Sequence, residues 1–411
     1  MNWRICGRMK TNIKSFNKNS ISNHPIVLWG GTMYGEIAYK VITEVYNGKV
    51  EAVIDNKFVS VPWLHGKTVR SKELKRYKSI DLLICAANSF SAIYEEAKRY
   101  SESIVIYDLK DILQDYQELC KVNPYMATSS YMYGDIDIDE ICQRYCYYAG
   151  DQNGYDEKLY LPYCVLCVTT KCSLKCKECA AFITKYIHHI DYEWTTLTSD
   201  FEQILSAIDG IMELEIMGGE PFLHDEINRI LLWCIIHPKI HAVKIVTNGT
   251  IVPKQDTWEI LQSKKIKLVI DDYGELSKNL HVIEQKAKEY GVLYEKQLLQ
   301  TWYQLSPISP KKMSVEQLKR VYSGCNFKSC IGMTNGRFYH CNVAGHMMNT
   351  GQTPQMENDY LQIQGRDWKT KELRDMLKRF LKCDYLESCD YCNYCIHKEV
   401  AVAEQDYTRI E

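Results

Sequence analysis

Short apolar runs alternate with amphipathic stretches along most of the chain, and this pattern predicts an α/β protein. Apolar runs of about four to eight residues, bounded by turn residues, are typical of strands buried on both faces of a sheet. Strands that alternate with helices indicate a parallel sheet, so we expect a Rossmann-like domain over residues 21–118. Its strands are predicted at Pro25–Trp29, Val50–Ile54, Ile80–Cys85 and Ile104–Tyr107.

The pattern stops and then resumes in the middle of the chain. Residues 119–158 are rich in Tyr, Asp and Gly, and we expect a linker there. Alternation returns over residues 159–320, which predicts a second α/β domain of a size that suits a partial barrel. Ser199 with Glu202 three residues later is a capping box that predicts a helix start, and another helix is expected from Asp225. The strands of this domain are predicted at Tyr163–Thr169, Leu214–Met217, Ala242–Val246 and Lys265–Ile270.

The two ends of the chain lack this alternation. Residues 1–20 are polar and contain no apolar segment of a secretory signal, so we expect a flexible tail there. The longest apolar run, Ile230–Ile236, is far too short to span a bilayer, and we therefore expect a cytoplasmic protein. From residue 321 the chain is cysteine-rich and irregular, which predicts a small domain over 321–411 that is organised by metal.

Composition narrows the classes of partner. The 411 residues carry a net charge of −2, which gives no reason to expect a nucleic acid or an anionic membrane as partner. In a reducing compartment the 18 cysteines should not form structural disulfides, and clustered ones point to metal or redox chemistry. They cluster at 172–179, 325–341 and 383–395, whereas isolated ones such as Cys85 and Cys234 are expected to be buried hydrophobic residues.

The first cluster places Cys172, Cys176 and Cys179 within eight residues, just after a predicted strand. A [4Fe–4S] cluster normally takes four thiolates, so three cysteines leave one iron without a protein ligand. Such an iron can bind a small molecule, as an open catalytic metal site does. The loop lies at the carboxyl edge of the predicted sheet, where α/β barrels carry out chemistry. Taken alone, the three cysteines also allow a zinc site.

The CxxxCxxC spacing resembles the signature of the radical S-adenosylmethionine superfamily, and Leu174 matches the apolar residue common inside that motif. The segment from Met217 to Pro221 (MGGEP) is similar to the family's GGEP loop, and the segment from Thr247 to Gly249 (TNG) resembles its TNG element. Asp271 ends the fourth strand in the matching place. The cofactor-binding residues that the resemblance implies are Gly218, Gly219, Glu220, Pro221, Thr247, Asn248 and Asp271.

The resemblance also implies a fold and an activity. The fold is a partial (β/α)6 radical S-adenosylmethionine barrel over residues 159–320. The activity is reductive cleavage of S-adenosylmethionine to a 5′-deoxyadenosyl radical that abstracts hydrogen from a substrate, with a flavodoxin- or ferredoxin-type electron donor. One residue departs from the motif, because Glu178 stands where the family usually has an aromatic residue that shields the adenine.

The C-terminal cysteines resemble the SPASM and twitch extensions of this superfamily, which bind auxiliary [4Fe–4S] clusters. Gly336 precedes Cys341 as it does at the start of those extensions, and Phe380 stands where a full SPASM pattern has a further cysteine. One or two auxiliary clusters are therefore implied. The partition that we expect joins the first three of these cysteines to one tail cysteine, and zinc is the alternative metal. The set comprises Cys325, Cys330, Cys341, Cys383, Cys389, Cys392 and Cys395.

A glycine-rich turn in the N-terminal domain predicts a nucleotide or nucleotide-sugar site. Gly30, Gly31 and Gly35 lie where a strand meets a helix, and a helix N-terminus can hold an anion. Asp55 ends the next strand, where a ribose-binding acid would lie. The alternative is a docking domain whose glycines only allow tight packing. The arrangement resembles Rossmann-like modules attached to sugar-modifying proteins.

Three functions remain open at this point, and no residue is assigned as a catalytic acid or base. The first is an enzyme that oxidises or epimerises a sugar or nucleotide-linked sugar, hence a small-molecule or glycan-type substrate. The second is a SPASM maturase that modifies a peptide or protein side chain, although the βαβ pattern argues against the winged-helix domain that such enzymes often carry. The third is a non-catalytic iron–sulfur protein or a zinc-stabilised binding protein, which would need no GGEP loop.

Overall fold

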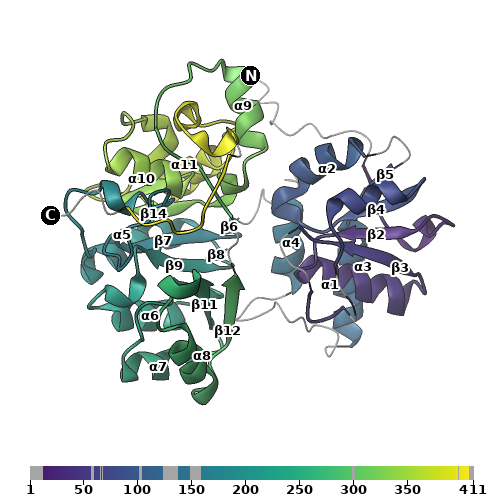
Figure 1. Ribbon diagram of the computed structural model, residues 1–411, viewed down its shortest axis with the longest axis horizontal. Coiled ribbons are helices and arrows are strands. Elements are labelled where there is room, and N and C mark those ends of the chain that lie inside the picture. The colour runs from purple at the N-terminus through teal and green to yellow at the C-terminus, as the bar shows by residue number, and fades with distance from the viewer. Residues whose placement is uncertain are drawn as a thin grey trace. The chain divides into compact units, whose positions relative to one another are not determined.

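The computed structural model describes residues 13–56, 60–64, 66, 68–100, 104–123, 138–148, 159–298, 301–396 and 398–406 (Figure 1). The chain forms two compact units. The first consists of Met1–Met132 and Ile136–Glu157, and the second of Tyr133–Asp135 and Lys158–Glu411. Within the described ranges, no helix is long and apolar enough to cross a membrane.

The first unit is built on a parallel five-stranded sheet in the order β1-β5-β4-β2-β3. Every residue of β2 and β4 is buried, the pattern expected of strands covered on both faces. The four predicted strands begin and end within one residue of those observed. The strands are β1 (Lys14–Ser15), β2 (Ile26–Trp29), β3 (Val50–Ile54), β4 (Ile80–Ile84) and β5 (Ile104–Asp108), and the helices between and after them are α1 (Met33–Lys40), α2 (Phe90–Lys98) and α3 (Lys110–Val122).

The structure differs from the predicted tail and linker. β1 pairs with β5, and Phe16 is fully buried, so this part of the chain belongs to the first unit's sheet and core. Helix α4 (Ile138–Tyr148) lies inside the predicted linker and packs into the same core through Tyr145. The Tyr145 hydroxyl donates to the Ile84 carbonyl at 2.8 Å and accepts from the Leu109 N–H at 3.1 Å. The polar, Tyr-rich composition concealed an amphipathic helix here.

The second unit is built on an eight-stranded sheet in the order β12-β11-β10-β9-β7-β14-β15-β16. Neighbours from β12 to β14 pair in parallel, whereas β15 and β16 pair antiparallel. The four predicted strands of this region match β7, β9, β10 and β11 to within two residues. The strands are β7 (Cys164–Thr169), β9 (Leu214–Gly218), β10 (Val243–Thr247), β11 (Ile266–Asp272), β12 (Tyr294–Leu298), β14 (Gly332–Thr334), β15 (Arg337–Tyr339) and β16 (Tyr360–Gln362), with two short pairs, β6 (Tyr160–Leu161) with β8 (Gly210–Ile211) and β13 (Trp302–Tyr303) with β17 (Glu399–Val400).

Helices pack against one face of this sheet. Leu214 and Ile216 of β9 share an apolar core with Phe201 and Ile230, whereas Glu215 between them lies on the other face because side chains alternate along a strand. The C-terminal ends of the parallel strands then carry the loops between strand and helix. The helices on this face are α5 (Trp194–Ala207), α6 (Ile227–Ile236), α7 (Gln255–Leu261), α8 (Leu280–Glu289) and α11 (Thr370–Phe380). Helix α10 (Asn342–Asn349) packs with Tyr339 in a separate apolar cluster on the other face, and α9 (Val315–Ser323) lies outside the core of the first face.

Helix α5 begins earlier than predicted. Its first residue is Trp194 and its N-cap is Glu193, so Ser199 lies inside the helix and the predicted capping box with Glu202 is wrong. Trp194 and Leu197 already pack against the apolar core, and this packing extends the helix beyond the local capping pattern. Helix α6 starts two residues after the predicted position.

The C-terminal part of the chain extends the sheet of the second unit instead of forming a separate body. β14 pairs in parallel with β7, with Gly332 opposite Val165. Helix α11 contributes Leu373 and Leu377 to the core that α5 also lines. Because these segments share one core, the contacts do not divide the chain at the predicted boundary near residue 321.

Candidate cofactor site

The loop that follows β7 carries the three cysteines of the CxxxCxxC motif at the C-terminal edge of the sheet. Cys176 is buried, Cys172 and Cys179 are half-buried, and all three pack with Leu174. Burial, with a smaller contribution from the nearby Cys179, raises the pKa of Cys172 to about 12 and that of Cys176 to about 11. Thiols of this kind bind metal only after losing their protons. The donor set therefore suits a cationic iron–sulfur cluster that stabilises three adjacent thiolates.

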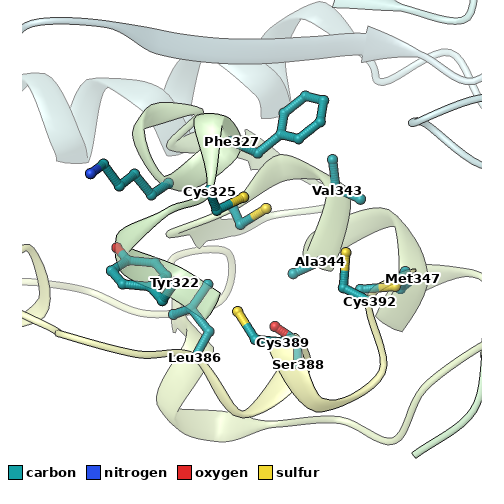
Figure 2. Close-up of a pocket in the computed structure, with 12 residues that line it drawn as sticks. Tyr322, Cys325, Phe327, Val343, Ala344, Met347, Leu386, Ser388, Cys389 and Cys392 are labelled. Carbon is teal, nitrogen blue, oxygen red and sulfur yellow. The ribbon is translucent and has the colours of Figure 1, made fainter. Parts of the chain in front are cut away.

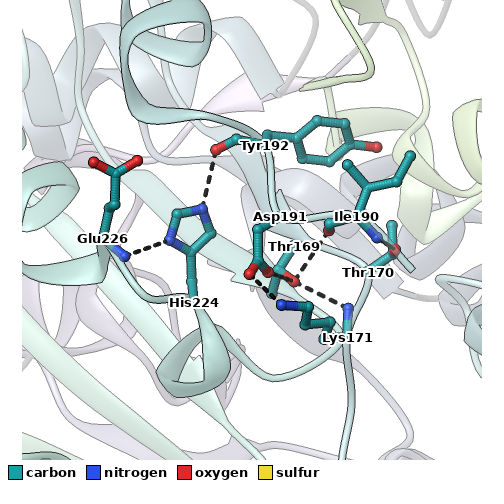
Figure 3. A network of polar contacts seen from close by, with 8 residues as sticks. All are labelled: Thr169, Thr170, Lys171, Ile190, Asp191, Tyr192, His224 and Glu226. Carbon is teal, nitrogen blue, oxygen red and sulfur yellow. Dashed lines mark hydrogen bonds and ion pairs between the residues drawn. The ribbon is translucent and has the colours of Figure 1, made fainter. Parts of the chain in front are cut away.

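Polar contacts fix the start of this loop (Figure 3). The Thr169 hydroxyl donates to the Asp191 carboxylate at 2.6 Å and accepts from the Lys171 N–H at 3.0 Å. Lys171 Nζ also forms an ion pair with Asp191 at 2.5 Å. The Thr170 hydroxyl accepts at 2.8 Å from the N–H of the residue before Asp191. The backbone that leads into Cys172 is thus held in one place by its own neighbours.

Gly219 lies directly against the start of the cysteine loop. Its N–H donates to the Thr169 carbonyl at 2.9 Å. A Cβ atom at Gly219 would lie 2.1 Å from the Lys171 carbonyl oxygen and 2.8 Å from Cys172 Cβ, while one at Gly218 would lie 2.3 Å from the Thr169 carbonyl oxygen. Only glycine lets the two loops approach this closely.

The Glu220 side chain is fully buried and joins the loop after β9 to the end of β10. Its carboxylate accepts from the Thr247 hydroxyl at 3.0 Å, from the Asn248 N–H at 2.9 Å and from the Phe222 N–H at 3.2 Å. Burial raises the pKa of Glu220 to about 7, although these donors oppose the rise. Pro221 then begins the short turn that follows. The structure therefore brings the GGEP and TNG segments into contact.

Two amide side chains reach the thiols. Asn248 Nδ2 lies 3.5 Å from Cys172 Sγ, and Gln405 Nε2 donates to Cys176 Sγ at 3.2 Å. Hydrogen bonds to cluster sulfurs tune the reduction potential of an iron–sulfur centre. Gln405 stands 229 residues after Cys176, and no motif marked it in the sequence.

Asp271 completes the set at the end of β11. Its carboxylate accepts from the Tyr273 hydroxyl at 3.1 Å. Burial raises the pKa of Tyr273, and the charge of Asp271 and nearby Cys179 raise it further. Asp271 also contributes to the raised pKa of Glu220, so it faces the same site. The cofactor residues predicted from the sequence thus gather at neighbouring strand ends.

A second group of cysteines lines a pocket in the C-terminal part of the chain (Figure 2). Cys325, Cys341, Cys389 and Cys392 all line it, together with apolar side chains such as Phe327. The space free of protein atoms is about 370 Å³, part of which is open to solvent. Burial raises the pKa of Cys341 and Cys389, and neighbouring cysteines raise it further. Four thiols around one cavity match the donor set of a [4Fe–4S] cluster.

The remaining cysteines of the predicted ligand set are not among those that line this pocket. Cys330 lies beside Glu215, and burial followed by that carboxylate raises its pKa to about 12. Cys383 lies 3.7 Å from the hydroxyl of Tyr322. The Cys395 side chain is outside the described residues. The pocket is thus lined by two of the first three cysteines and by two tail cysteines. The predicted partition had all three of the first cysteines and one tail cysteine. In the described part of the chain, no three His, Cys, Asp or Glu side chains are arranged to hold a single metal ion.

Comparison with known proteins adds two relatives, although no family model matches the chain. GTP 3′,8-cyclase of Clostridium acetobutylicum is 30% identical over 95 residues, which cover 23% of this chain and 29% of that protein. The subtilosin biosynthesis protein AlbA of Bacillus subtilis is 31% identical over 108 residues, 25% of this chain and 22% of that protein. Both relatives point to the radical S-adenosylmethionine superfamily, which the cysteine motif of this chain resembles.

The aligned segments are short relative to the proteins compared. The chain spans less than a third of the length of the curated relatives that it matches. Among solved structures, it is similar to BtrN in complex with AdoMet and 2-DOIA, with 18% identity, a TM-score of 0.34, and coverage of 57% of this chain and 94% of that one.

Glu178 is where this chain departs from the superfamily's three-cysteine motif. Its carboxylate accepts from the N–H of Leu305 at 2.8 Å, from the N–H of Ser306 at 2.9 Å and from the Ser306 hydroxyl at 2.7 Å. The residue that precedes Cys179 therefore ties the cysteine loop to the segment after β13 instead of presenting an aromatic ring.

A buried polar network on α10 borders the same strand ends. His346 Nδ1 lies 2.8 Å from the Tyr186 hydroxyl, and Asn342 Nδ2 lies 3.4 Å from His346 Nε2 and 3.6 Å from Met217 Sδ. Burial lowers the pKa of His346 to about 4, so the imidazole is neutral at neutral pH. Met217 directly precedes Gly218. No motif in the sequence marked these residues.

In the first unit, the glycine-rich turn is closed by contacts within the unit. The Gly31 N–H donates to the Asp55 carboxylate at 2.9 Å, and Trp63 Nε1 donates to the Gly31 carbonyl at 2.9 Å. Asp55, the predicted ribose-binding acid, is 8% exposed. One carboxylate oxygen of Asp55 therefore already serves the turn itself.

Proposed function

We propose that this chain is an enzyme that reductively cleaves S-adenosylmethionine and uses the resulting radical to abstract hydrogen from a substrate. One observation carries the proposal: the three-cysteine loop, Gly219, Glu220 and Asn248 meet at the C-terminal ends of β7, β9 and β10. We propose further that the parallel part of this sheet is a partial (β/α)6 barrel and that the first unit is a Rossmann-like domain. The resemblance to the superfamily and the two relatives that point to it support this proposal.

The residues of the site have roles that their surroundings support. Cys172, Cys176 and Cys179 would hold a [4Fe–4S] cluster with one iron open to the amino and carboxylate groups of S-adenosylmethionine. When the cluster is reduced and S-adenosylmethionine is bound to it, the two together would supply the 5′-deoxyadenosyl radical. Gly219 lets its backbone approach the cysteine loop closely, and Glu220 would offer a buried carboxylate to the amino group of the cofactor. A flavodoxin- or ferredoxin-type protein is the proposed electron donor, because reductive cleavage requires a low potential.

We propose a single auxiliary cluster in the C-terminal pocket. Cys325, Cys341, Cys389 and Cys392 line one cavity and would provide four thiolates, so this cluster would have no open iron. Such a cluster exchanges electrons and does not ligate a substrate. That property favours a reaction in which the substrate radical is oxidised.

For the substrate we propose a sugar or nucleotide-linked sugar that is oxidised or epimerised. The parallel sheet of the first unit is an architecture that binds nucleotides, and it supports a domain that recognises a nucleotide-bearing small molecule. One relative, GTP 3′,8-cyclase, is named for a nucleotide. The other, AlbA, is named for bacteriocin biosynthesis and favours the second candidate, modification of a peptide.

The catalytic proposal is tested by product formation. The full chain is reconstituted anaerobically with iron and sulfide, reduced with dithionite and given S-adenosylmethionine. We expect 5′-deoxyadenosine and methionine from the wild type, and none from Cys176→Ala. Cys234→Ala, a buried cysteine of α6 away from the site, is the matched control and should retain the product. Absence of 5′-deoxyadenosine above the Cys176→Ala level would refute the proposal.

The auxiliary cluster is tested by iron counting. A variant without Cys172, Cys176 and Cys179 should retain about four irons per chain if one auxiliary cluster is present. In that background, Cys389→Ala should remove this iron, whereas Cys383→Ala should leave it in place. About eight residual irons would indicate two auxiliary clusters, and zinc without iron would contradict an iron–sulfur site.

The substrate class is tested by mass spectrometry of 5′-deoxyadenosine. Fractionated nucleotide sugars and a synthetic peptide library are supplied in separate reactions. In each, the substrates carry deuterium on carbon and the buffer is ordinary water. We expect nucleotide sugars to increase 5′-deoxyadenosine formation and to transfer deuterium into it. An increase with peptides alone would instead establish the second candidate.

A further inference from the structure

Two aromatic side chains form a corner beside the three-cysteine loop. The ring centroids of Tyr273 and Trp302 are 5.7 Å apart and their planes meet at 86°, an edge-to-face arrangement. Both rings pack against the apolar cluster of Leu174, Cys176 and Ala403. Both are half-buried, so part of their surface stays accessible. Among the described residues of this cluster and its partly buried neighbours, no other residue is aromatic.

Trp302 reaches this position because its segment is tied to the cysteine loop at two places. Glu178, directly before Cys179, accepts three hydrogen bonds from Leu305 and Ser306, at 2.7–2.9 Å. On the other side, Trp302 pairs with Val400 between β13 and β17. That strand leads to residues 404–406, where the Glu404 carbonyl accepts from the Lys177 N–H at 2.8 Å.

We propose that Trp302, with Tyr273, forms the wall on which the adenine of S-adenosylmethionine stacks, and that Glu178 is the positioning residue of that wall. The inference rests on the proposed function, because it assumes that the cofactor binds at the three cysteines. Adenine is flat and has a π-face, and stacking on an aromatic ring is a sequence-tolerant and stabilising contact for every base. The methionine and adenine parts belong to one small molecule, so the adenine must lie close to the thiols.

The proposal explains the departure at Glu178. A carboxylate offers no surface for an adenine, but it is an acceptor for backbone N–H groups. In this chain Glu178 binds the 302–306 segment and so positions the indole of Trp302 beside the loop. Trp302 lies 123 positions after Cys179, the last cysteine of the motif. The aromatic contact is thereby supplied from outside the motif.

The test measures the dissociation constant of S-adenosylmethionine by anaerobic equilibrium dialysis with the reconstituted full chain. Trp302→Leu should weaken binding about ten-fold, which is ~1.4 kcal/mol. Trp302→Phe, which keeps a ring, should lose less. Trp368→Leu, which removes a partly buried indole packed against the main core of the second unit, is the matched control and should bind as the wild type does. Iron content and the electron paramagnetic resonance of the reduced cluster should be unchanged in all three.

A probe without adenine separates stacking from general damage. S-methylmethionine keeps the amino, carboxylate and sulfonium groups, so its binding should be the same in wild type and Trp302→Leu. Glu178→Ala should weaken S-adenosylmethionine binding to a similar extent, and should have little further effect in the Trp302→Leu background, because coupled residues are not additive. Glu178→Gln, which keeps an acceptor oxygen, should restore most of the affinity.

The outcomes distinguish this inference from the proposed function. Unchanged S-adenosylmethionine affinity in an iron-replete Trp302→Leu protein would overturn the aromatic wall and leave the catalytic proposal standing. Equal losses for S-methylmethionine and S-adenosylmethionine would also overturn it, since the indole would then support the site without contacting adenine. A wild type that assembles a cluster but binds no S-adenosylmethionine would overturn both.

Discussion

Replacing Gly219 by alanine should damage the cysteine loop far more than it damages the fold. The new Cβ would lie 2.1 Å from the Lys171 carbonyl oxygen and 2.8 Å from Cys172 Cβ. Both are well inside van der Waals contact, and the first is a backbone atom that cannot rotate away. Overpacking of this kind costs about 1–3 kcal/mol. The strain is relieved by moving the loop, and that displacement takes Cys172 away from its two partner cysteines.

The experiment needs a variant of similar stability whose damage lies elsewhere. Gly291 follows α8 at a φ of +66°, and its Cβ would have no atom within 4 Å. Gly291→Ala should therefore cost about 1–2 kcal/mol through backbone strain alone. At about 2–4 °C per kcal/mol, both variants should lower the melting temperature by several degrees.

The decisive measurement is iron per chain in a background that lacks Cys325 and Cys389, so that only the first site contributes. The parent and Gly291→Ala should hold about four irons, and Gly219→Ala less than half of that. Affinity for S-adenosylmethionine should fall together with the iron. A Gly219→Ala protein with full iron and parental affinity would show that the close approach of the two loops does not shape the site.

Two further predictions concern stability. Tyr145→Phe removes the hydroxyl that bonds the Ile84 carbonyl and the Leu109 N–H, and should lower the free energy of unfolding by about 1–3 kcal/mol. The measurement is the melting temperature of the first unit, and an unchanged value would contradict the packing of α4. Burial lowers the pKa of His346 from 6.5 to about 4, so the unfolded chain takes up a proton that the folded chain does not; this costs the fold nothing above pH 6.5 and about 3 kcal/mol by pH 4. The difference in melting temperature between wild type and His346→Gln should therefore shrink over that range, and a constant difference would refute this.

The local pattern of the sequence was sufficient for the strands and for placing the three motif cysteines on one loop. Strands such as β3 have an apolar run bounded by turn residues, and this signal needs no distant partner. The three cysteines lie on one loop, so their spacing alone brings the thiols together. Gly219 and Glu220 follow the next strand, and parallel strands in sequence place their C-terminal ends side by side.

Contacts between distant segments were decided only by the tertiary structure. The sequence could not say that Cys325 shares a pocket with Cys389, 64 positions further along the chain, or that Cys330 is not among the residues that line it, because a cluster of cysteines has many equally plausible partitions. Helix α4 was hidden, because its amphipathic face is recognisable only against the core that it covers.

The same holds for the surroundings of the first site. The motif marked Cys176 and Glu178, but not their partners. Gln405 and Trp302 reach the cysteine loop because a two-stranded ribbon and the carboxylate of Glu178 fold the C-terminal chain back onto it. Short-range spacing therefore determined which thiols gather on the loop, and long-range packing determined what surrounds them, since side-chain contacts between distant segments depend on the whole fold.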